Sequence, residues 1–176
     1  FDQENADEEP SDATILPFTR NLFDPMDFTP VCLEPISPHI QRRTTVGFEL
    51  ALSIIFTSGI QHYVDTPEGL AKVPDGVRDF LRHVPAVWDD TRFITGFPGK
   101  EAVLARRGDG RWYLGGINGE ATEKHLVLDL HALPVSEGAL ITDGPDGFVQ
   151  SHVALAANKK FEVTLRPNGG FVVVFN

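Results

Sequence analysis

The stretch TTVGFELALSIIFTS, residues 44–58, gives the strongest helix signal in the chain. Thr44 or Thr45 can cap this helix, and Gly59 can end it. Its apolar residues occupy most of the helix circumference, which is typical of a helix buried on more than one side. We therefore expect it either to be buried on more than one side or to lie between a sheet and another layer.

Shorter elements precede and follow this helix. A strand is expected at Met26–Phe28, before a proline, and a second at Ile60–Val64. The sequence then predicts a helix start at Asp65–Glu68 and a further helix at Asp75–His83. Strand and helix alternate here, which is the pattern of a parallel α/β unit.

The texture changes after about residue 92. Short β-rich runs follow, separated by Gly, Asn and Asp turns, and they are expected at Phe93–Phe97, Ala102–Ala105, Trp112–Ile117, His125–Leu130, Ala139–Thr142, Phe148–His152, Phe161–Leu165 and Phe171–Phe175. Strands at this spacing indicate an antiparallel sandwich or barrel. The sequence therefore divides into an α/β part, residues 15–92, and an all-β domain, residues 93–176.

Residues 1–14 have a different composition. Between Phe1 and Asp12, only Phe1 and Ala6 are apolar, and most of the rest are acidic or polar. Such a stretch buries little surface, so we expect an acidic flexible lead-in.

Composition excludes several classes of function. The 176 residues include 15 Lys and Arg against 25 Asp and Glu, for a net charge of −10, which argues against binding to nucleic acid or anionic membranes. The sequence has no apolar run near the roughly 20 residues needed to cross a bilayer. Its one cysteine, Cys32, excludes a disulfide within the chain and a cysteine-based metal site.

Two motifs make the sequence recognisable. Pro17-Phe18-Thr19-Arg20, followed by Pro25-Met26-Asp27-Phe28-Thr29-Pro30, resembles the PFTR…GPMDYTP signature of glycoside hydrolase family 97. This family contains α-glucosidases and α-galactosidases related to bacterial starch-utilisation enzymes. Further stretches agree in order over most of residues 15–120, among them ELAL at 49–52, WDDT at 88–91 and GFPGK at 96–100.

The resemblance implies a fold. The family has an N-terminal β-sandwich, a central (β/α)₈ barrel and a C-terminal β domain. Residues 15–92 would be the last strands and helices of the barrel, and residues 93–176 the C-terminal antiparallel β-sandwich domain. We expect the chain, which begins with Phe1 rather than Met, to be a fragment or a processed product. It departs from the family pattern at Asp24 and Val31, where glycine is usual, and at Phe28, where tyrosine is usual.

The resemblance also implies a function. The parent would be an exo-acting α-glycosidase whose principal catalytic carboxylates lie upstream, so we assign no catalytic residue and no metal ligand to this chain. We expect the isolated chain to be inactive. Calcium would be bound in the parent enzyme, by ligands outside this chain. The resemblance further implies an oligosaccharide substrate and a periplasmic or secreted bacterial location.

Four residues are candidates for substrate binding. Barrel enzymes act at the C-terminal ends of their strands, and the resemblance places Asp27, Phe28, Gln61 and His62 there. Asp27 either bonds a sugar hydroxyl or satisfies loop amides. His62 is either a neighbour of the substrate or a histidine of the core.

Two other classes of function stay open. One is a carbohydrate-binding β-sandwich module, which an exposed row of Trp and Tyr would favour; we expect Trp88, Trp112 and Tyr113 to pack inside instead. The other is a non-catalytic structural domain. The expected partners are the N-terminal part of the parent chain and, as an open alternative, a second copy of the chain. The sequence does not decide between glucose and galactose, between inversion and retention, or the oligomeric state.

Overall fold

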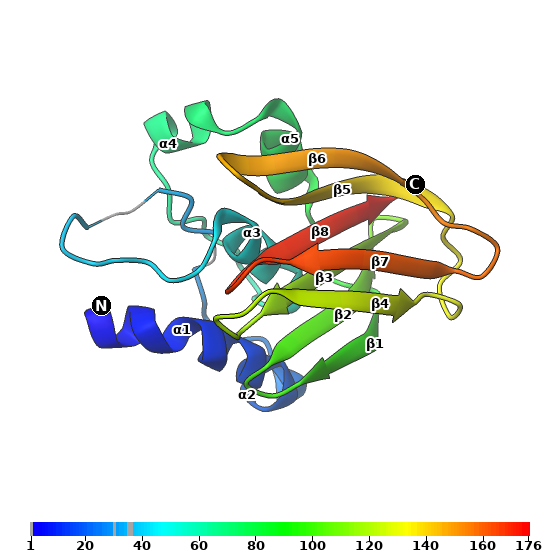
Figure 1. Ribbon diagram of the computed structural model, residues 1–176, viewed down its shortest axis with the longest axis horizontal. Coiled ribbons are helices and arrows are strands. Elements are labelled where there is room, and N and C mark those ends of the chain that lie inside the picture. The colour runs from blue at the N-terminus through cyan, green and yellow to red at the C-terminus, as the bar shows by residue number, and fades with distance from the viewer. Residues whose placement is uncertain (1, 30, 35–36) are drawn as a thin grey trace.

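The computed structural model describes residues 2–29, 31–34 and 37–176. Helices come first in the chain (Figure 1): α1 (Gln3–Ile15), the 3₁₀ helix η1 (Leu16–Phe18), α2 (Arg20–Phe23), α3 (Val46–Ile55), α4 (Pro67–Lys72) and α5 (Asp75–His83). Strands follow: β1 (Asp90–Phe97), β2 (Glu101–Gly108), β3 (Arg111–Asn118), β4 (Lys124–Asp129), β5 (Glu137–Gly144), β6 (Gly147–Ala154), β7 (Lys160–Leu165) and β8 (Gly170–Phe175). This order confirms the predicted helices and the change to an antiparallel β domain after them, whereas the strands predicted before residue 92 do not form.

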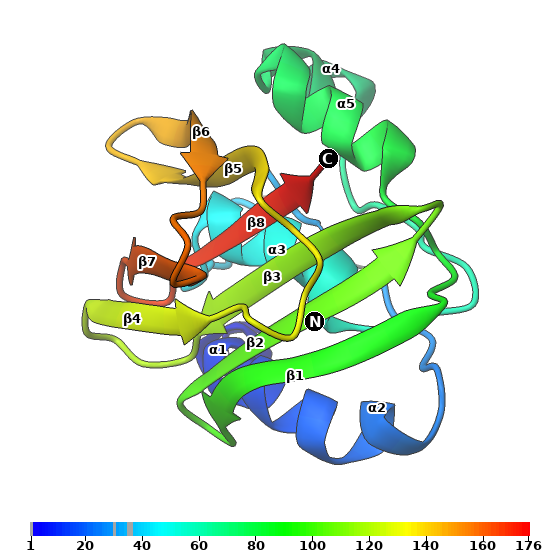
Figure 2. The same ribbon diagram turned by 90° about the vertical axis from the view of Figure 1, so that its right-hand side faces the viewer.

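The strands form two antiparallel sheets. Six of them pair in the order β1-β2-β3-β8-β5-β6, and β4 pairs with β7. The last strand, β8, lies between β3 and β5 in the middle of the larger sheet (Figure 2). Strands β1 and β6 are the edges of that sheet.

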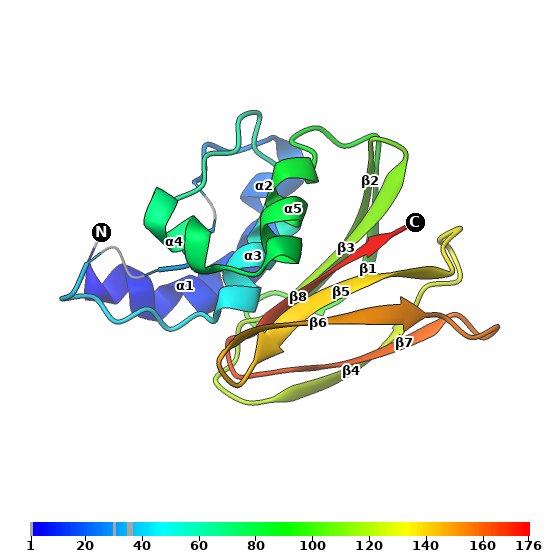
Figure 3. The same ribbon diagram turned by 90° about the horizontal axis from the view of Figure 1, so that it is seen from above.

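The domain has three layers. Helices cover one face of the six-stranded sheet, and the β4–β7 pair covers the other (Figure 3). On β8, Val172 belongs to the core shared with α3, whereas Phe171, Val173 and Phe175 belong to the core shared with β4 and β7. Burial on both faces explains why β8 reads as a continuous apolar run rather than an alternating one.

Helix α3 lies very close to the sheet. A Cβ atom added to Gly47 would lie 2.5 Å from the carbonyl oxygen of Gly170, and one added to Gly170 would lie 2.6 Å from the Cα atom of Phe48. These distances are too short for any side chain. Glycine at both positions therefore permits the helix backbone to approach β8 directly.

Charged side chains of the sheet hold both ends of α3. The Asp143 carboxylate of β5 accepts from the Gly47 N–H and the Thr45 hydroxyl, each at 2.7 Å. At the other end, the Arg106 guanidinium of β2 donates to the carbonyls of Ile54 (2.6 Å) and Ile55 (3.0 Å). An acid at the N-terminus and a base at the C-terminus satisfy groups that a helix leaves unbonded and complement its dipole.

Two strands predicted from the sequence are absent at their positions. Met26–Phe28 and Ile60–Val64 are described but do not form strands. Met26 donates its N–H to the Thr57 carbonyl at 2.9 Å, which brings the start of the first segment beside the chain leaving α3. A strand needs a continuous ladder of backbone partners, and these segments lack one among the described residues.

The start of the chain is a helix rather than a flexible lead-in. Asp2 caps α1 by accepting from the Asn5 N–H at 3.0 Å. Ala6, Pro10 and Ala13 are buried at helical spacing, and these three small side chains pack the helix against the rest of the chain, while Glu4, Glu8 and Asp12 are exposed. Four residues lie outside the described part of the chain: Phe1 of the predicted lead-in, Pro30, Pro35 and Ile36. In the described part of the chain, no helix is both long and apolar enough to span a bilayer.

Replacing Arg106 tests whether its hydrogen bonds to the C-terminal end of α3, here called the clamp, stabilise the fold. We expect Arg106→Met to lower the free energy of unfolding by about 2–4 kcal/mol, because it leaves buried carbonyls of α3 without donors. Arg107→Met, at the exposed neighbouring position, should change it by less than about 0.5 kcal/mol. Urea denaturation of both variants measures the difference, and equal stabilities would contradict the clamp.

Candidate functional site

A cavity of about 580 Å³ opens between α1, the segment before α3 and α3 itself. Its lining is mainly apolar with a few charged groups: Ala6, Glu9, Phe28, Thr29, Cys32, Ser37, Ile40, Arg42, Glu49 and Val64. Phe28 and Thr29 belong to the segment that the sequence places at a strand end, where a barrel enzyme binds substrate. The cavity is therefore the candidate site.

The structure brings one of the four predicted site residues into this cavity. Phe28 lines it and packs edge-on against Phe56, with ring centroids 4.7 Å apart. Gln61 turns back to α3 and donates to the Ser53 carbonyl at 2.9 Å. The side chains of Asp27 and His62 are exposed, so the core position considered for His62 is wrong for this chain.

Glu49 is the most deeply buried acid of the cavity, with 3% of its surface exposed. One carboxylate oxygen accepts from the Cys32 N–H at 3.0 Å, and the other accepts from the Thr44 hydroxyl. Burial raises the pKa of Glu49, although these hydrogen bonds and the charge of Arg42 act in the opposite direction.

Glu9 supplies a second acid from α1. Burial, and after it the charge of Glu49, raises the pKa of Glu9 to about 7, while Arg42 opposes the shift. The cavity thus holds two acids against one guanidinium. A carboxyl group accepts hydrogen bonds from hydroxyl groups, so Glu9 suits a polyhydroxylated ligand, whereas both oxygens of Glu49 bond groups of the chain itself.

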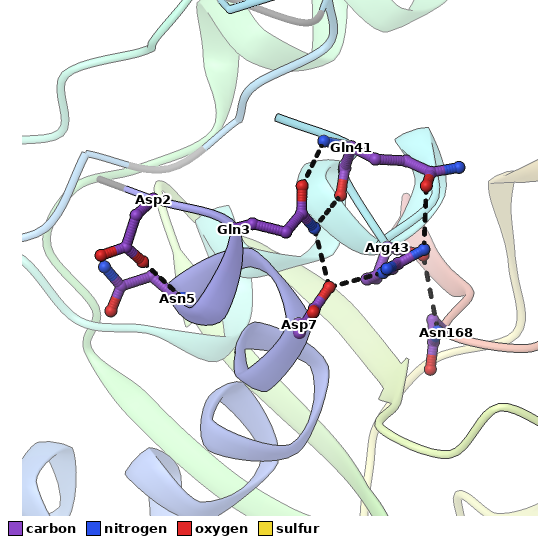
Figure 4. Close-up of polar contacts among 7 residues, drawn as sticks. All are labelled: Asp2, Gln3, Asn5, Asp7, Gln41, Arg43 and Asn168. Atoms are coloured by element: carbon purple, nitrogen blue, oxygen red, sulfur yellow. Dashed lines mark hydrogen bonds and ion pairs between the residues drawn. The ribbon is translucent and has the colours of Figure 1, made fainter. Parts of the chain in front are cut away.

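A polar network fixes α1 beside this cavity (Figure 4). The side-chain amide of Gln3 accepts from the Gln41 N–H at 2.8 Å and donates to the Gln41 carbonyl at 3.0 Å, so it bonds both backbone groups of Gln41. Asp7 accepts from Arg43 at 2.7 Å, and Asn168 donates to the Arg43 carbonyl at 3.5 Å. The predicted lead-in is therefore a wall of the candidate site.

Asp65 lies just before the start of α4, next to the cavity-lining Val64. Its Oδ1 accepts from the Thr66 N–H at 2.8 Å, and Thr66 caps α4 by accepting from the Gly69 N–H at 3.0 Å. Among the described residues, Asp65 Oδ2 is a buried oxygen without a hydrogen-bond partner. The predicted helix start at this position is confirmed.

Val31 carries backbone strain next to the site. Its φ is +68°, in the left-handed region that favours glycine and is an outlier for a β-branched residue. Its side chain is fully buried. The glycine that the family resemblance places here fits this backbone without strain.

The described residues do not fit a calcium site. Nowhere in residues 2–29, 31–34 and 37–176 do three or more His, Cys, Asp or Glu side chains gather to hold a metal ion. We therefore derive no step through a metal from this chain.

The large aromatic side chains form no binding platform. Trp88 and Tyr113 pack edge-on at 5.4 Å, and the Tyr113 hydroxyl donates to the His83 carbonyl at 3.2 Å. Both Trp and both Tyr of the chain are buried or half-buried. The packing predicted for Trp88, Trp112 and Tyr113 is confirmed, and stacking on a sugar is not favoured.

Comparison with known proteins identifies the class. Residues 87–176 match a family model described as "Glycosyl-hydrolase 97 C-terminal, oligomerisation". The chain belongs to glycoside hydrolase family 97 and corresponds to the C-terminal region of that family.

Relatives extend the likeness over the helical part. The chain is 38% identical over 165 residues to a probable retaining alpha-galactosidase of Streptomyces bingchenggensis, covering 92% of this chain and 25% of the relative. It is 27% identical over 180 residues to a retaining alpha-galactosidase of Bacteroides thetaiotaomicron, covering 90% and 26%. The chain thus spans about a quarter of the length of these relatives.

Solved structures agree in fold. A beta-arabinopyranosidase matches 99% of this chain with a TM-score of 0.91 and 33% identity, over 29% of its own length. A family 97 enzyme from Pseudoalteromonas sp. strain K8, solved with panose, matches 95% of the chain with a TM-score of 0.81 and 26% identity, over 28% of its length. Both structural matches include the helices as well as the two sheets of this chain.

Sequence reasoning missed most of the cavity. It did not find Glu9 or Arg42, because these residues come together only when α1 packs against a segment that is distant in the sequence. Ala6, Pro10 and Ala13 were the available signal, since their spacing of four and three residues is helical. The role of Asp143 as a cap for α3 depends on tertiary contact and has no local signal.

A pH titration tests the Glu9 environment. A pKa raised from 4.5 to about 7 means that the folded chain holds a proton that the unfolded chain releases, so stability should fall as pH rises through this window. Glu9 contributes at most about 3 kcal/mol to this fall. Glu9→Gln should flatten the pH dependence, and Glu8→Gln, at an exposed position, should leave it unchanged. The midpoints of urea denaturation between pH 4.5 and 7.5 measure this pH dependence. If stability fell with pH as steeply in Glu9→Gln as in the wild type, the raised pKa of a buried Glu9 would be contradicted.

Proposed function

We propose that this chain is the C-terminal part of an exo-acting retaining α-glycosidase that hydrolyses terminal α-galactosides. The observation that carries the proposal is the alignment of about nine-tenths of the chain with two proteins named as retaining alpha-galactosidases. The cavity supports it, because Phe28 offers an apolar surface and Glu9 suits sugar hydroxyls.

The catalytic carboxylates belong, in this proposal, to the part of the enzyme upstream of the chain. Retention needs two carboxyl groups about 5–5.5 Å apart on either side of the scissile bond. Glu49 uses both oxygens to bind Cys32 and Thr44, so it is unsuited to either role. The chain supplies instead a wall of the cleft and the β domain that braces the barrel. Calcium, where the enzyme requires it, would be held by upstream ligands.

A second substrate is supported by one observation. The structural match with a TM-score of 0.91 is a beta-arabinopyranosidase. A β-L-arabinopyranoside has the ring configuration of an α-D-galactopyranoside and lacks its exocyclic hydroxymethyl group. One site therefore accepts both sugars if little of its binding energy comes from that group.

Hydrolysis assays test this proposal. We expect the complete enzyme to release p-nitrophenol from the α-galactoside and the β-L-arabinopyranoside much faster than from the α-glucoside. The 176-residue chain should release none, and EDTA should reduce the activity of the enzyme. Equal rates on the glucoside would contradict the substrate assignment, and activity of the chain alone would contradict the upstream location of the catalytic carboxylates.

We also propose that the β domain associates with a second copy. The description of the family model as an oligomerisation domain supports this. Edge strand β1 exposes Phe93 (58%) and Phe97 (61%), and an open edge with apolar side chains favours association.

Sedimentation of the complete enzyme tests this association. Phe97→Glu should shift it toward the monomer, because a charge would be buried at the contact. Val149→Glu, on the opposite edge strand β6, is the matched control and should leave the oligomer intact. Dissociation by the control alone would contradict the assignment to β1.

A further inference from the structure

A carboxylate inside α3 requires an explanation. The other residues of α3 from Gly47 to Ile55 are buried and uncharged, and Glu49 is buried among them. Taking a carboxylate out of water costs several kcal/mol unless its partners compensate. Asp143 and Arg106, not Glu49, bond the ends of α3 to the sheet, so the contacts of Glu49 indicate what its charge does.

Those contacts join the two ends of one segment. Cys32 follows the Phe28–Thr29 stretch that lines the cavity, and Thr44 stands just before α3. Glu49 accepts a hydrogen bond from each. Arg42 completes the arrangement by donating to the carbonyls of Cys32 and of Thr44, the latter at 3.0 Å. One buried acid thus fixes both ends of the segment.

The same segment forms a side of the cavity. Cys32, Ser37, Ile40 and Arg42 line the cavity, as Phe28 does. On the outside, the segment is held to α1 by Gln3 and Asp7, whose contacts are exposed. Exposed ion pairs contribute little, whereas a buried charge-assisted contact contributes more. The position of this wall therefore depends chiefly on the inner contacts, which Glu49 makes together with Arg42.

We propose that Glu49 is a positioning residue of the glycosidase, which sets the wall formed by Cys32, Ser37, Ile40 and Arg42 against the Phe28–Thr29 side of the substrate cavity. This inference rests on the proposed function and goes beyond it. Glu49 acts through the backbone of Cys32 and the hydroxyl of Thr44, and does not touch the sugar.

The test uses the complete enzyme that contains this chain, with the substitution Glu49→Gln. The amide side chain keeps the size of the residue, but it has lost one acceptor oxygen and the charge. We expect KM for p-nitrophenyl α-galactoside to rise about 10- to 100-fold while kcat changes less, because the wall is misplaced rather than the reacting groups. A merely structural role would lower the active fraction, which reduces kcat and leaves KM unchanged.

A second readout follows the wall itself. Iodoacetamide alkylation of Cys32, located by peptide mass spectrometry, should be about 10-fold faster in Glu49→Gln, because the Cys32 backbone loses its anchor and the thiol loses a charge that raises its pKa. Thr44→Ala keeps that charge, so its alkylation rate reports the anchoring alone. Thr44→Ala removes one of the two hydrogen bonds and should shift KM and alkylation in the same direction by a smaller factor. It serves as the test if Glu49→Gln does not fold. Glu68→Gln, an exposed acid on α4, is the control and should change neither readout.

The outcomes are distinguishable. A wild-type enzyme inactive on every galactoside and arabinoside contradicts the proposed function and with it the catalytic part of this inference. An active enzyme in which Glu49→Gln or Thr44→Ala leaves KM and Cys32 alkylation unchanged contradicts the role of Glu49 alone.

Discussion

The attachment of α3 to the six-stranded sheet is the constraint on which the rest of the structure depends. The helix is buried along its length, so its unbonded terminal N–H and carbonyl groups cannot turn to water. Asp143 and Arg106 supply the missing partners from the sheet, and Gly47 and Gly170 permit the close approach. The cavity lies at the N-terminal part of α3, because Glu49 extends from its first turns.

The sequence predicted the elements whose signals are local. Helix α5 was predicted with its observed bounds, and the runs after residue 93 all became strands, since periodicity and turn residues are properties of neighbouring positions. Helix α1 was missed because its stability depends on the Asp2 cap and on burial of three small side chains, neither of which an acidic composition reveals. The strands expected at Met26–Phe28 and Ile60–Val64 required partners that the described residues do not provide.

The site was predictable only in part for a related reason. Resemblance to the family placed Phe28 near the substrate, and Phe28 does line the cavity. Glu9 and Arg42 reach the same cavity from positions 33 residues apart, and only the folded chain brings them together. Asp27, Gln61 and His62 remain predictions about a substrate complex, because in this chain they lie exposed or turned to α3. The chain spans about a quarter of the length of its relatives, so a site assembled from many strand ends, as the family resemblance implies, could be predicted from it only in part.

Native-state hydrogen exchange tests most directly the claim that α3 and the sheet form one unit. The backbone amides of Leu50–Ile54 should open with the same free energy as those of β3 and β8, because the helix shares its core and both its terminal contacts with the sheet. In Arg106→Met, the protection of all three elements should fall together. Exchange of the α3 amides at a free energy lower by more than about 2 kcal/mol, with β3 and β8 still protected, would contradict the account.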